Sequence, residues 1–267
     1  MKIIVLTKQT PDTETKIVLS SDKQKIDYKD TKFTLSAYDE FAIEEALQIK
    51  QRVGESVCEV VLLSFGPADV KERLIKGLAM GADRGLIIEN KGFEDLDSLG
   101  IAHVLSSVIQ KEGADLVLCG KQGLDDDNMH VGMMTAELLG WPHVNVVTKL
   151  ALESPHKTAR VEREVEGGMV EVFELTLPAV FGAHKSLNTP RYAALPGIMK
   201  AKKKPMDVRS PQDCGVDLEK LKSLARTFVE SYQYPPEKPK GRMFQGEPVE
   251  VMVDKVVKLL REEAKVI

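Results

Sequence analysis

The 267-residue chain has few cysteines and none of the short motifs that mark the common enzyme centres. Cys58, Cys119 and Cys214 are widely spaced and odd in number, so we expect buried free thiols rather than a disulfide framework or a CxxC site. The patterns GxGxxG, GxxxxGK(S/T), GxSxG and HExxH are missing, and the five histidines have no metal-ligand spacing. The sequence therefore predicts neither a catalytic centre nor a metal site.

Long hydrophobic runs and an excess of positive charge are missing too. The first apolar run, residues 3–6, has four residues, whereas a secretory signal needs about seven and a membrane span about 18. We therefore expect a cytoplasmic protein with no membrane insertion, which reaches other compartments only through partners. Lys and Arg total 37 against 41 Asp and Glu, and a net charge of −4 argues against a nucleic-acid partner.

Short apolar runs alternate with helical patterns through the first half of the chain. Strands are predicted at residues 3–6, 57–63, 85–88 and 115–119, and apolar residues at helical spacing lie between them. Strands separated by helices of this length form right-handed βαβ units. We therefore predict an α/β fold of the Rossmann-like, nucleotide-binding kind, with a parallel sheet covered on both faces.

The second half has a different pattern. Residues 144–152, 158–165 and 169–177 read as strands without helices between them, and Glu166-Gly167-Gly168 is a turn signal, so we expect an added antiparallel hairpin. Residues 232–246 read as a linker and precede an amphipathic helix up to residue 264. We therefore predict one domain over 1–231 and an extended arm over 232–267, folded back or offered to a partner.

The most informative stretch is residues 116–132, where a strand ends at Cys119, a glycine-punctuated loop follows, and a helix should begin near Asn128. Ligands of such sheets bind beyond the carboxyl ends of the strands, and a helix N-terminus suits a phosphate. The aspartates 125–127 would repel a phosphate, so we expect them to cap the helix or hold ribose hydroxyls, with the phosphate over residues 129–132. The alternative is that residues 125–128 only cap a helix.

A second feature is the segment 185–204, which carries six positive residues and no acidic one. It also places Tyr192, Leu195, Ile198 and Met199 among prolines. Apolar anchors with a basic rim are typical of a protein docking site, since the anchor supplies affinity and the charges steer encounter. The alternative is a charged surface loop.

At these residues the chain resembles the beta subunits of electron transfer flavoproteins, over essentially its whole length. The matching segments are Glu-Phe-Ala-Ile-Glu-Glu-Ala at 40–46, Ala-Met-Gly-Ala-Asp-Arg-Gly at 79–85, Gly-Lys-Gln-Gly-Leu-Asp-Asp-Asp at 120–127, and residues 187–204. The resemblance implies an electron carrier rather than an enzyme, in which an alpha and a beta subunit form a heterodimer. The heterodimer would carry electrons from flavin dehydrogenases, such as the acyl-CoA dehydrogenases of fatty acid beta-oxidation, to a membrane quinone oxidoreductase that it meets transiently.

In this family FAD is held mainly by the alpha subunit, and the beta subunit binds a structural AMP. Here His130 stands where a glutamine is usual and Val131 where a threonine is frequent. The positions that match the AMP contacts are Leu6, Ser36, Ala37, Tyr38, Asp39, Phe65, Gly123, Leu124, Asp125, Asp126, Asp127, Asn128, Met129, His130, Val131, Gly132, Met133 and Met134.

The basic segment matches the recognition loop of the family, and Leu195 matches the leucine that enters a pocket on the dehydrogenase. The C-terminal arm would reach across the alpha subunit. The residues that the resemblance implies in partner docking are Tyr192, Leu195, Pro196, Ile198, Met199, Lys200, Lys202 and Lys203, and Lys204 adds charge beside them.

Two other functions stay open. Flavin-bifurcating relatives resemble Asp-Gly-Asp-Thr at residues 125–128 and bind a second FAD, which oxidises NADH, in the beta subunit; Asp-Asp-Asp-Asn here resembles the AMP type. The other alternative, a free-standing adenine-nucleotide hydrolase or transferase, has no phosphate-activating lysine loop to support it.

Overall fold

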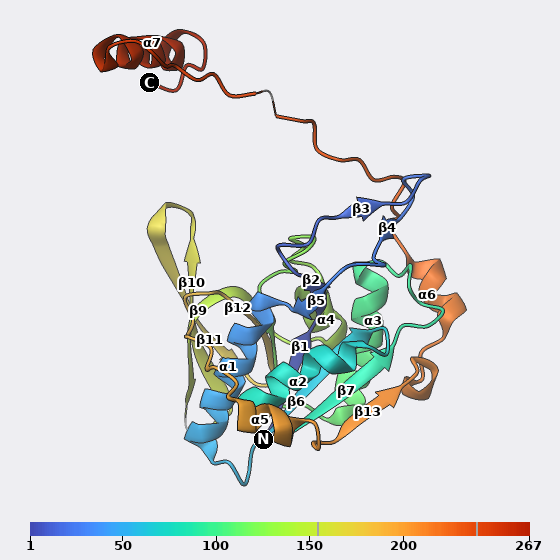
Figure 1. Cartoon of the computed structure of the whole chain (residues 1–267). Helices are drawn as coiled ribbons and strands as arrows, with labels where there is room; N and C mark the ends of the chain where they lie inside the picture. The colour runs from blue at the N-terminus through green and yellow to red at the C-terminus, as the bar shows by residue number, and fades with distance from the viewer. Residues whose placement is uncertain (154, 239) are drawn as a thin grey trace. The chain divides into compact units, whose positions relative to one another are not determined.

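The computed structural model describes residues 1–153, 155–238 and 240–267. These residues form two compact units, Met1–Ser231 and Tyr232–Ile267 (Figure 1). The first unit contains the sheet and six of the labelled helices, and the second contains helix α7.

The first unit is organised around a nine-stranded sheet in the order β11-β10-β9-β12-β8-β1-β6-β7-β13. All neighbours from β9 to β13 in this order pair in parallel, whereas β10 pairs antiparallel with both β9 and β11. The predicted α/β fold with a parallel sheet and an added antiparallel hairpin is therefore confirmed. The strands are β1 (Lys2–Thr7), β6 (Glu59–Gly66), β7 (Arg84–Glu89), β8 (Leu116–Gly120), β9 (His143–Glu153), β10 (Thr158–Val165), β11 (Met169–Thr176), β12 (Ala179–Ala183) and β13 (Met206–Arg209).

Helices cover both faces because side chains alternate along each strand. In β1, Ile3 and Val5 join the core that contains α1, α2 and α5, whereas Ile4 and Leu6 join the core that contains α3, α4 and α6. The helices of this unit are α1 (Ala37–Val53), α2 (Val70–Met80), α3 (Ser98–Glu112), α4 (Val131–Leu139), α5 (Leu195–Ala201) and α6 (Leu218–Leu224).

Four local features differ from the sequence-based expectation. Helix α4 begins at Val131 rather than near Asn128, and the loop before it includes Asp127 with a left-handed φ of 52°. The segment 185–204 contains the short helix α5, which was not expected, and neither was the edge strand β13. Two small strand pairs lie outside the main sheet, β2 (Gln9–Pro11) with β5 (Phe33–Leu35) and β3 (Val18–Leu19) with β4 (Ile26–Asp27).

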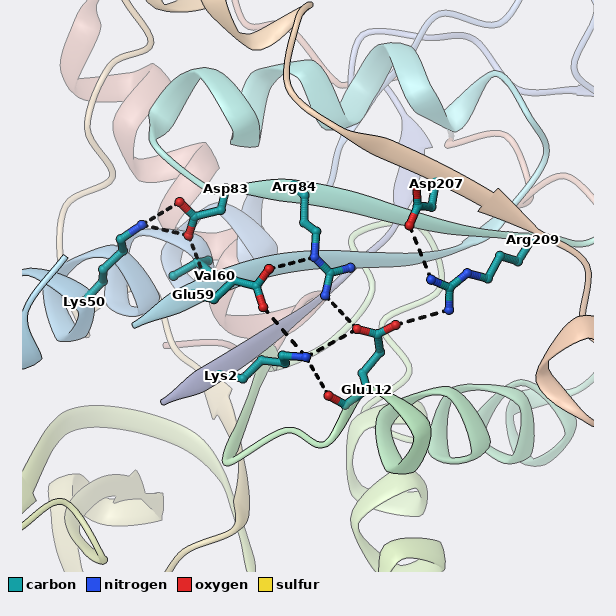
Figure 2. Close-up of polar contacts among 9 residues, drawn as sticks. All are labelled: Lys2, Lys50, Glu59, Val60, Asp83, Arg84, Glu112, Asp207 and Arg209. Atoms are coloured by element: carbon teal, nitrogen blue, oxygen red, sulfur yellow. Dashed lines mark hydrogen bonds and ion pairs between the residues drawn. The ribbon is translucent and has the colours of Figure 1, made fainter. Parts of the chain in front are cut away.

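The amino ends of the central strands are tied together by ion pairs (Figure 2). Glu112, the last residue of α3, accepts from Arg84 Nη2 at 2.6 Å and from Arg209 Nη1 at 3.1 Å. Arg84 also donates to Glu59 Oε1 at 2.8 Å, and Lys2 Nζ lies 3.6 Å from Glu112 Oε2. These contacts join the amino ends of β1, β6 and β7 to the end of α3, and Arg209 connects the last residue of the edge strand β13 to the same carboxylate.

The second unit contains α7 (Val249–Glu262), in which no residue is buried. An apolar stripe that includes Val249, Val253, Val256 and Leu260 is exposed on this helix. The predicted linker has no helix or strand over 232–238 and 240–246, and Pro239 lies outside the described residues. Within the part of the chain that the structure describes, no helix is both long enough and apolar enough to span a bilayer.

Candidate functional site: a cavity at the carboxyl ends of the strands

A cavity of about 160 Å³ lies where the strand order reverses. From β1 the chain continues to β6 and β7 on one side and then returns to β8 on the other, and ligands of open α/β sheets bind at such a switch point. One buried water needs only about 10–15 Å³, so the cavity has room for a small molecule. Its lining residues are Leu6, Thr7, Lys8, Ser36, Asp39, Leu63, Phe65, Ser98, Ile101, Leu105, Cys119, Gly120, Lys121, Gln122, Gly123, Asp126, Asn128, Met129, His130, Val131, Gly132, Met133 and Asn145.

One wall of the cavity is apolar. Leu6 and Leu63 come from the ends of β1 and β6, Ile101 and Leu105 from α3, and Val131 from the start of α4. Side chains of this kind suit the face of a flat ring, which hides apolar surface while its edge still needs polar partners.

Asp39, in the first turn of α1, connects the loops that follow β1 and β8. Its carboxylate accepts from the backbone N–H of Lys8 at 2.7 Å and from that of Gly120 at 3.1 Å. The side chain is buried, and burial raises the pKa of Asp39 to about 7 although these N–H groups and the Lys8 charge favour the ionised form. The carboxylate therefore fixes two strand ends, but it is charged only at some cost in free energy.

Lys8 holds the acidic loop in place. Its Nζ lies 2.8 Å from Asp125 Oδ1 and 3.0 Å from Asp126 Oδ2. Burial by itself would lower the pKa of Lys8, but the two carboxylates outweigh that effect and raise it. Asp126 also accepts from the N–H of Asn128, and Asp127 accepts from Gln122. The expectation that these aspartates cap α4 is wrong, because His130 occupies the N-cap position and makes no side-chain capping hydrogen bond. The other half of that expectation, that they hold ribose hydroxyls, stays a prediction.

Two glycines allow close packing at the edge of the cavity. A Cβ on Gly132 would lie 2.6 Å from Cys119 Sγ, and one on Gly120 would lie 2.6 Å from Asp39 Oδ1. Glycine at position 132 therefore lets the first turn of α4 approach the end of β8. The buried thiol beside it is inert, since burial raises the pKa of Cys119 to about 12.

Asn145 reaches the cavity from a bulge in β9. The pairing with β12 shifts so that residues 145 and 146 face the single residue Gly182, and Val146 takes a φ of 62°. Asn145 Nδ2 donates to Lys121 O at 3.0 Å, and its Oδ1 takes the space that a side chain at position 182 would need. No sequence signal marks this bulge, because β-branched residues rarely adopt positive φ.

Ser36, one of the lining residues of the cavity, has an unsatisfied hydroxyl. It is the N-cap residue of α1, yet its side chain makes no capping hydrogen bond, although N-cap serines usually accept one. Its Oγ is buried and has no hydrogen-bond partner among the described residues. A buried hydroxyl without a partner is costly, so Ser36 is a candidate to hydrogen-bond a ligand.

The structure brings most of the predicted nucleotide residues to this cavity, but not all of them. Tyr38 packs with Lys121 Nζ 5.3 Å from its ring centroid, and Asp125 meets the cavity only through Lys8. Lys8 was missed, and its position just after the predicted strand 3–6 could have indicated it. The predicted residues absent from the lining are Ala37, Tyr38, Leu124, Asp125, Asp127 and Met134.

A second candidate site is the segment 185–204, here called the docking segment. Tyr192, Leu195 and Met199 are 94%, 71% and 66% exposed, and Pro196, Lys200, Lys202 and Lys203 are exposed as well. Ile198 is half-buried. Lys204 was expected to add free charge, but its Nζ donates to the carbonyls of Leu78 and Ala82, at 3.0 and 2.6 Å.

A mostly parallel sheet with helices on both faces and a cavity at its switch point defines an α/β protein of the Rossmann-like class. The electron transfer flavoprotein domain matches residues 25–213. The chain therefore belongs to the electron transfer flavoprotein family, and the predicted resemblance is confirmed.

Three relatives cover most of the chain, and each is called an electron transfer flavoprotein subunit beta. The Homo sapiens protein is 40% identical over 261 residues, which is 97% of this chain and 96% of the relative. The Bacillus subtilis protein is 38% identical over 272 residues and covers 100% of both chains. The Bradyrhizobium diazoefficiens protein is 40% identical over 218 residues, or 82% of this chain and 85% of the relative.

Proposed function

We propose that this chain is the beta subunit of an electron transfer flavoprotein, binds one AMP in the cavity and docks flavin dehydrogenases through the docking segment. Its companion is an alpha subunit that holds most of the FAD, and its acceptor is a membrane quinone oxidoreductase. The unsatisfied hydroxyl of Ser36 in a cavity at the switch point of the sheet is the observation that carries the nucleotide part of this proposal.

The cavity residues fit an adenine nucleotide. The apolar wall would take the face of the adenine, and Ser36 and Asn145 would supply hydrogen bonds to its polar atoms. The N–H groups in the first turn of α4 have no partner within the helix and would hold the phosphate. Lys8 reduces the repulsion that Asp125 and Asp126 would otherwise exert on it. Bound AMP supplies no redox chemistry and would connect the strand ends.

The remaining features fit binding roles rather than covalent chemistry. Leu195 would enter a pocket of the dehydrogenase, and Lys200, Lys202 and Lys203 would steer the encounter. The apolar stripe of α7 would pack against the alpha subunit, since an amphipathic helix is stabilised by burying its apolar face.

A flavin-bifurcating complex is the second candidate. Its beta subunit would carry a second FAD in place of AMP. Asp126 argues against this candidate. Its side chain lines the cavity and pairs with Lys8, whereas the pattern of bifurcating relatives has glycine at the matching position.

Nucleotide extraction tests the cofactor assignment. The chain is co-purified with its alpha subunit, the complex is denatured, and the released nucleotides are separated and quantified. One AMP and one FAD per heterodimer are expected. Two FAD molecules and no AMP would establish the bifurcating alternative, and no adenine nucleotide beyond one FAD would overturn the assignment of the cavity.

Shortening Leu195 tests the docking assignment. Leu195→Ala should weaken docking by about 1–3 kcal/mol, because an exposed anchor that fills a partner pocket contributes on that scale. The measurement is kcat/KM for electron transfer from a reduced dehydrogenase, with flavin and AMP content as controls. Val57→Ala shortens another exposed side chain, 61% exposed, and should change nothing. Unaltered kinetics of Leu195→Ala with every donor would contradict the assignment.

A further inference from the structure

The docking segment is fixed to α1 at its first half. Arg191 donates from Nε to Glu44 Oε2 at 2.8 Å and from Nη2 to Glu44 Oε1 at 2.9 Å, and its backbone N–H reaches Oε2 at 3.1 Å. Three residues earlier, Asn188 Nδ2 donates to Phe41 O at 3.0 Å and to Glu45 Oε2 at 3.1 Å. Five hydrogen bonds thus hold residues 188–191 on one helix.

The α1 carboxylates in this contact are unusual because they are buried. Glu44 and Glu45 are 4% and 3% exposed. Burial alone would raise the pKa of Glu44, but the hydrogen bonds from Arg191 outweigh it and hold that pKa below its ordinary value. A buried carboxylate is retained only with well-placed partners, and a planar guanidinium bound through two nitrogens is the most directional partner available.

The second half of the docking segment is fixed to α2. Lys204 Nζ donates to the carbonyls of Leu78 and Ala82 at the C-terminal end of that helix. Burial lowers the pKa of Lys204, yet the ammonium stays directed at these carbonyls, where a positive charge is favoured. Ala201 is fully buried in the core, and a Cβ on Gly197 would lie 3.1 Å from Ala79 O.

Between these two anchors the segment projects outward. Tyr192, Leu195 and Met199 are the exposed large apolar residues there. A free loop of this length would have to be ordered when it binds, and that ordering lowers affinity, whereas a segment fixed at both ends is preorganised.

We propose that Glu44 is a positioning residue for docking: its contact with Arg191, together with the seat of Lys204 on α2, presents Leu195 to the dehydrogenase in a preformed conformation. The proposal rests on the docking role given under Proposed function. It assigns a role to three charged residues, the buried Glu44 and the half-buried Arg191 and Lys204.

Glu44→Gln separates positioning from charge steering. This change removes a negative charge beside a basic segment, so steering alone predicts faster association with a dehydrogenase. Positioning predicts the opposite, a loss of about fivefold to tenfold in kcat/KM through a raised KM, because Arg191 loses its charged partner. Arg191→Lys keeps the charge but loses the two-nitrogen contact, and it should show a similar loss.

The experiment uses the full chain in complex with its alpha subunit. Lys76→Gln is the matched control, since it removes an ion pair between α2 and another α1 glutamate, Glu40, and none of the hydrogen bonds described above that fix the docking segment. A second readout needs no dehydrogenase: amide hydrogen exchange over residues 192–203 should speed up about tenfold in Glu44→Gln and stay unchanged in Lys76→Gln.

The outcomes distinguish this inference from the docking assignment. If Leu195→Ala weakens transfer but Glu44→Gln and Arg191→Lys do not, the positioning role is overturned and docking stands. If Leu195→Ala has no effect, docking itself fails, and the exchange measurement decides whether the anchors order the segment. Unchanged exchange in Glu44→Gln and Arg191→Lys overturns the inference in either case.

Discussion

The two ends of the central sheet are built in opposite ways. At the amino ends, Arg84, Glu59 and Glu112 satisfy one another through ion pairs (Figure 2). At the carboxyl ends, Ser36 has an unsatisfied hydroxyl and Asp39 carries a carboxyl whose pKa burial raises to about 7. The closed end is organised for stability, whereas the open end keeps a buried hydroxyl without a partner among the described residues and a carboxyl that is charged only at a cost in free energy.

This comparison shows that one sheet can separate stability from binding. Substitutions at the closed end should lower the free energy of unfolding and leave nucleotide binding intact. Substitutions at the open end should alter nucleotide binding or the pH dependence of stability.

The largest expected effect comes from Asp39. Its pKa is 3.8 in ordinary surroundings and about 7 in the folded chain, so between these values the folded state holds one more proton than the unfolded state. The unfolding free energy should therefore fall by about 4 kcal/mol as pH rises from about 4 to about 7. Asp39→Asn should lack this dependence in nucleotide-free protein, as measured by urea unfolding at several pH values.

The charged groups facing Asp39 are Lys8, which favours ionisation, and Asp125, which opposes it. Asp213→Asn is the control: hydrogen bonds from Ser210 hold the pKa of the Asp213 carboxyl below its ordinary value, so its loss should not remove the fall in stability as pH rises. If the stability of wild type and of Asp39→Asn depends on pH in the same way, the pKa of Asp39 is not raised by burial. The contrast between the two ends of the sheet would then not hold at this residue.

Breaking the closed end should cost somewhat less. Glu112→Gln removes the charge that Arg84 and Arg209 share, and its side chain is only 11% exposed, so we expect a loss of about 3 kcal/mol in unfolding free energy. AMP content should not change. Glu219→Gln, in an exposed pair with Lys222, should cost less than about 0.5 kcal/mol. If Glu112→Gln is as stable as wild type, the ion pairs of Glu112 contribute nothing to the free energy of unfolding.

Overfilling the open end should weaken nucleotide binding. In Gly132→Ala the new Cβ meets Cys119 Sγ at 2.6 Å, so α4 must shift, and AMP affinity should fall about 10- to 100-fold by titration calorimetry. Adding Cys119→Ala removes the sulfur and should restore most of the affinity. If the double variant binds as poorly as Gly132→Ala alone, the collision is not the cause.

Ser36→Ala should give the smallest effect. AMP affinity should fall about fivefold, the value of one hydrogen bond, while the unfolding free energy of the nucleotide-free chain should not fall, because the buried hydroxyl caps nothing and has no partner in the described part of the chain. Asp217→Ala provides the contrast: Asp217 caps α6, so its loss should lower stability by about 1 kcal/mol without affecting AMP. A clear loss of stability in Ser36→Ala would indicate a hidden capping role.

Local patterns were sufficient to predict the sheet and much of the cavity. The alternation of apolar runs and helical spacing follows from burial on both faces, and residues 120–132 lie beyond a strand end, where ligands of such sheets bind. The contact of Lys8 with Asp125 joins residues 117 positions apart, so no local pattern contains it. At the bulge, Val146 adopts a positive φ that valine disfavours. This conformation goes with the register shift in the pairing of β9 with β12, which no local sequence pattern contains.

Helix α1 begins at the cavity with Asp39 and, little more than a turn later, holds Arg191 through Glu44. Helix α1 moves as a rigid body, so a displacement of α1 that accommodates a different nucleotide at Asp39 would also displace Glu44 and misalign the docking segment. We call this rigid helix the rod. Redesign for another dehydrogenase should therefore leave α1 intact and vary Tyr192, Leu195 and Met199, whose side chains are free to change without disturbing either end of that rod.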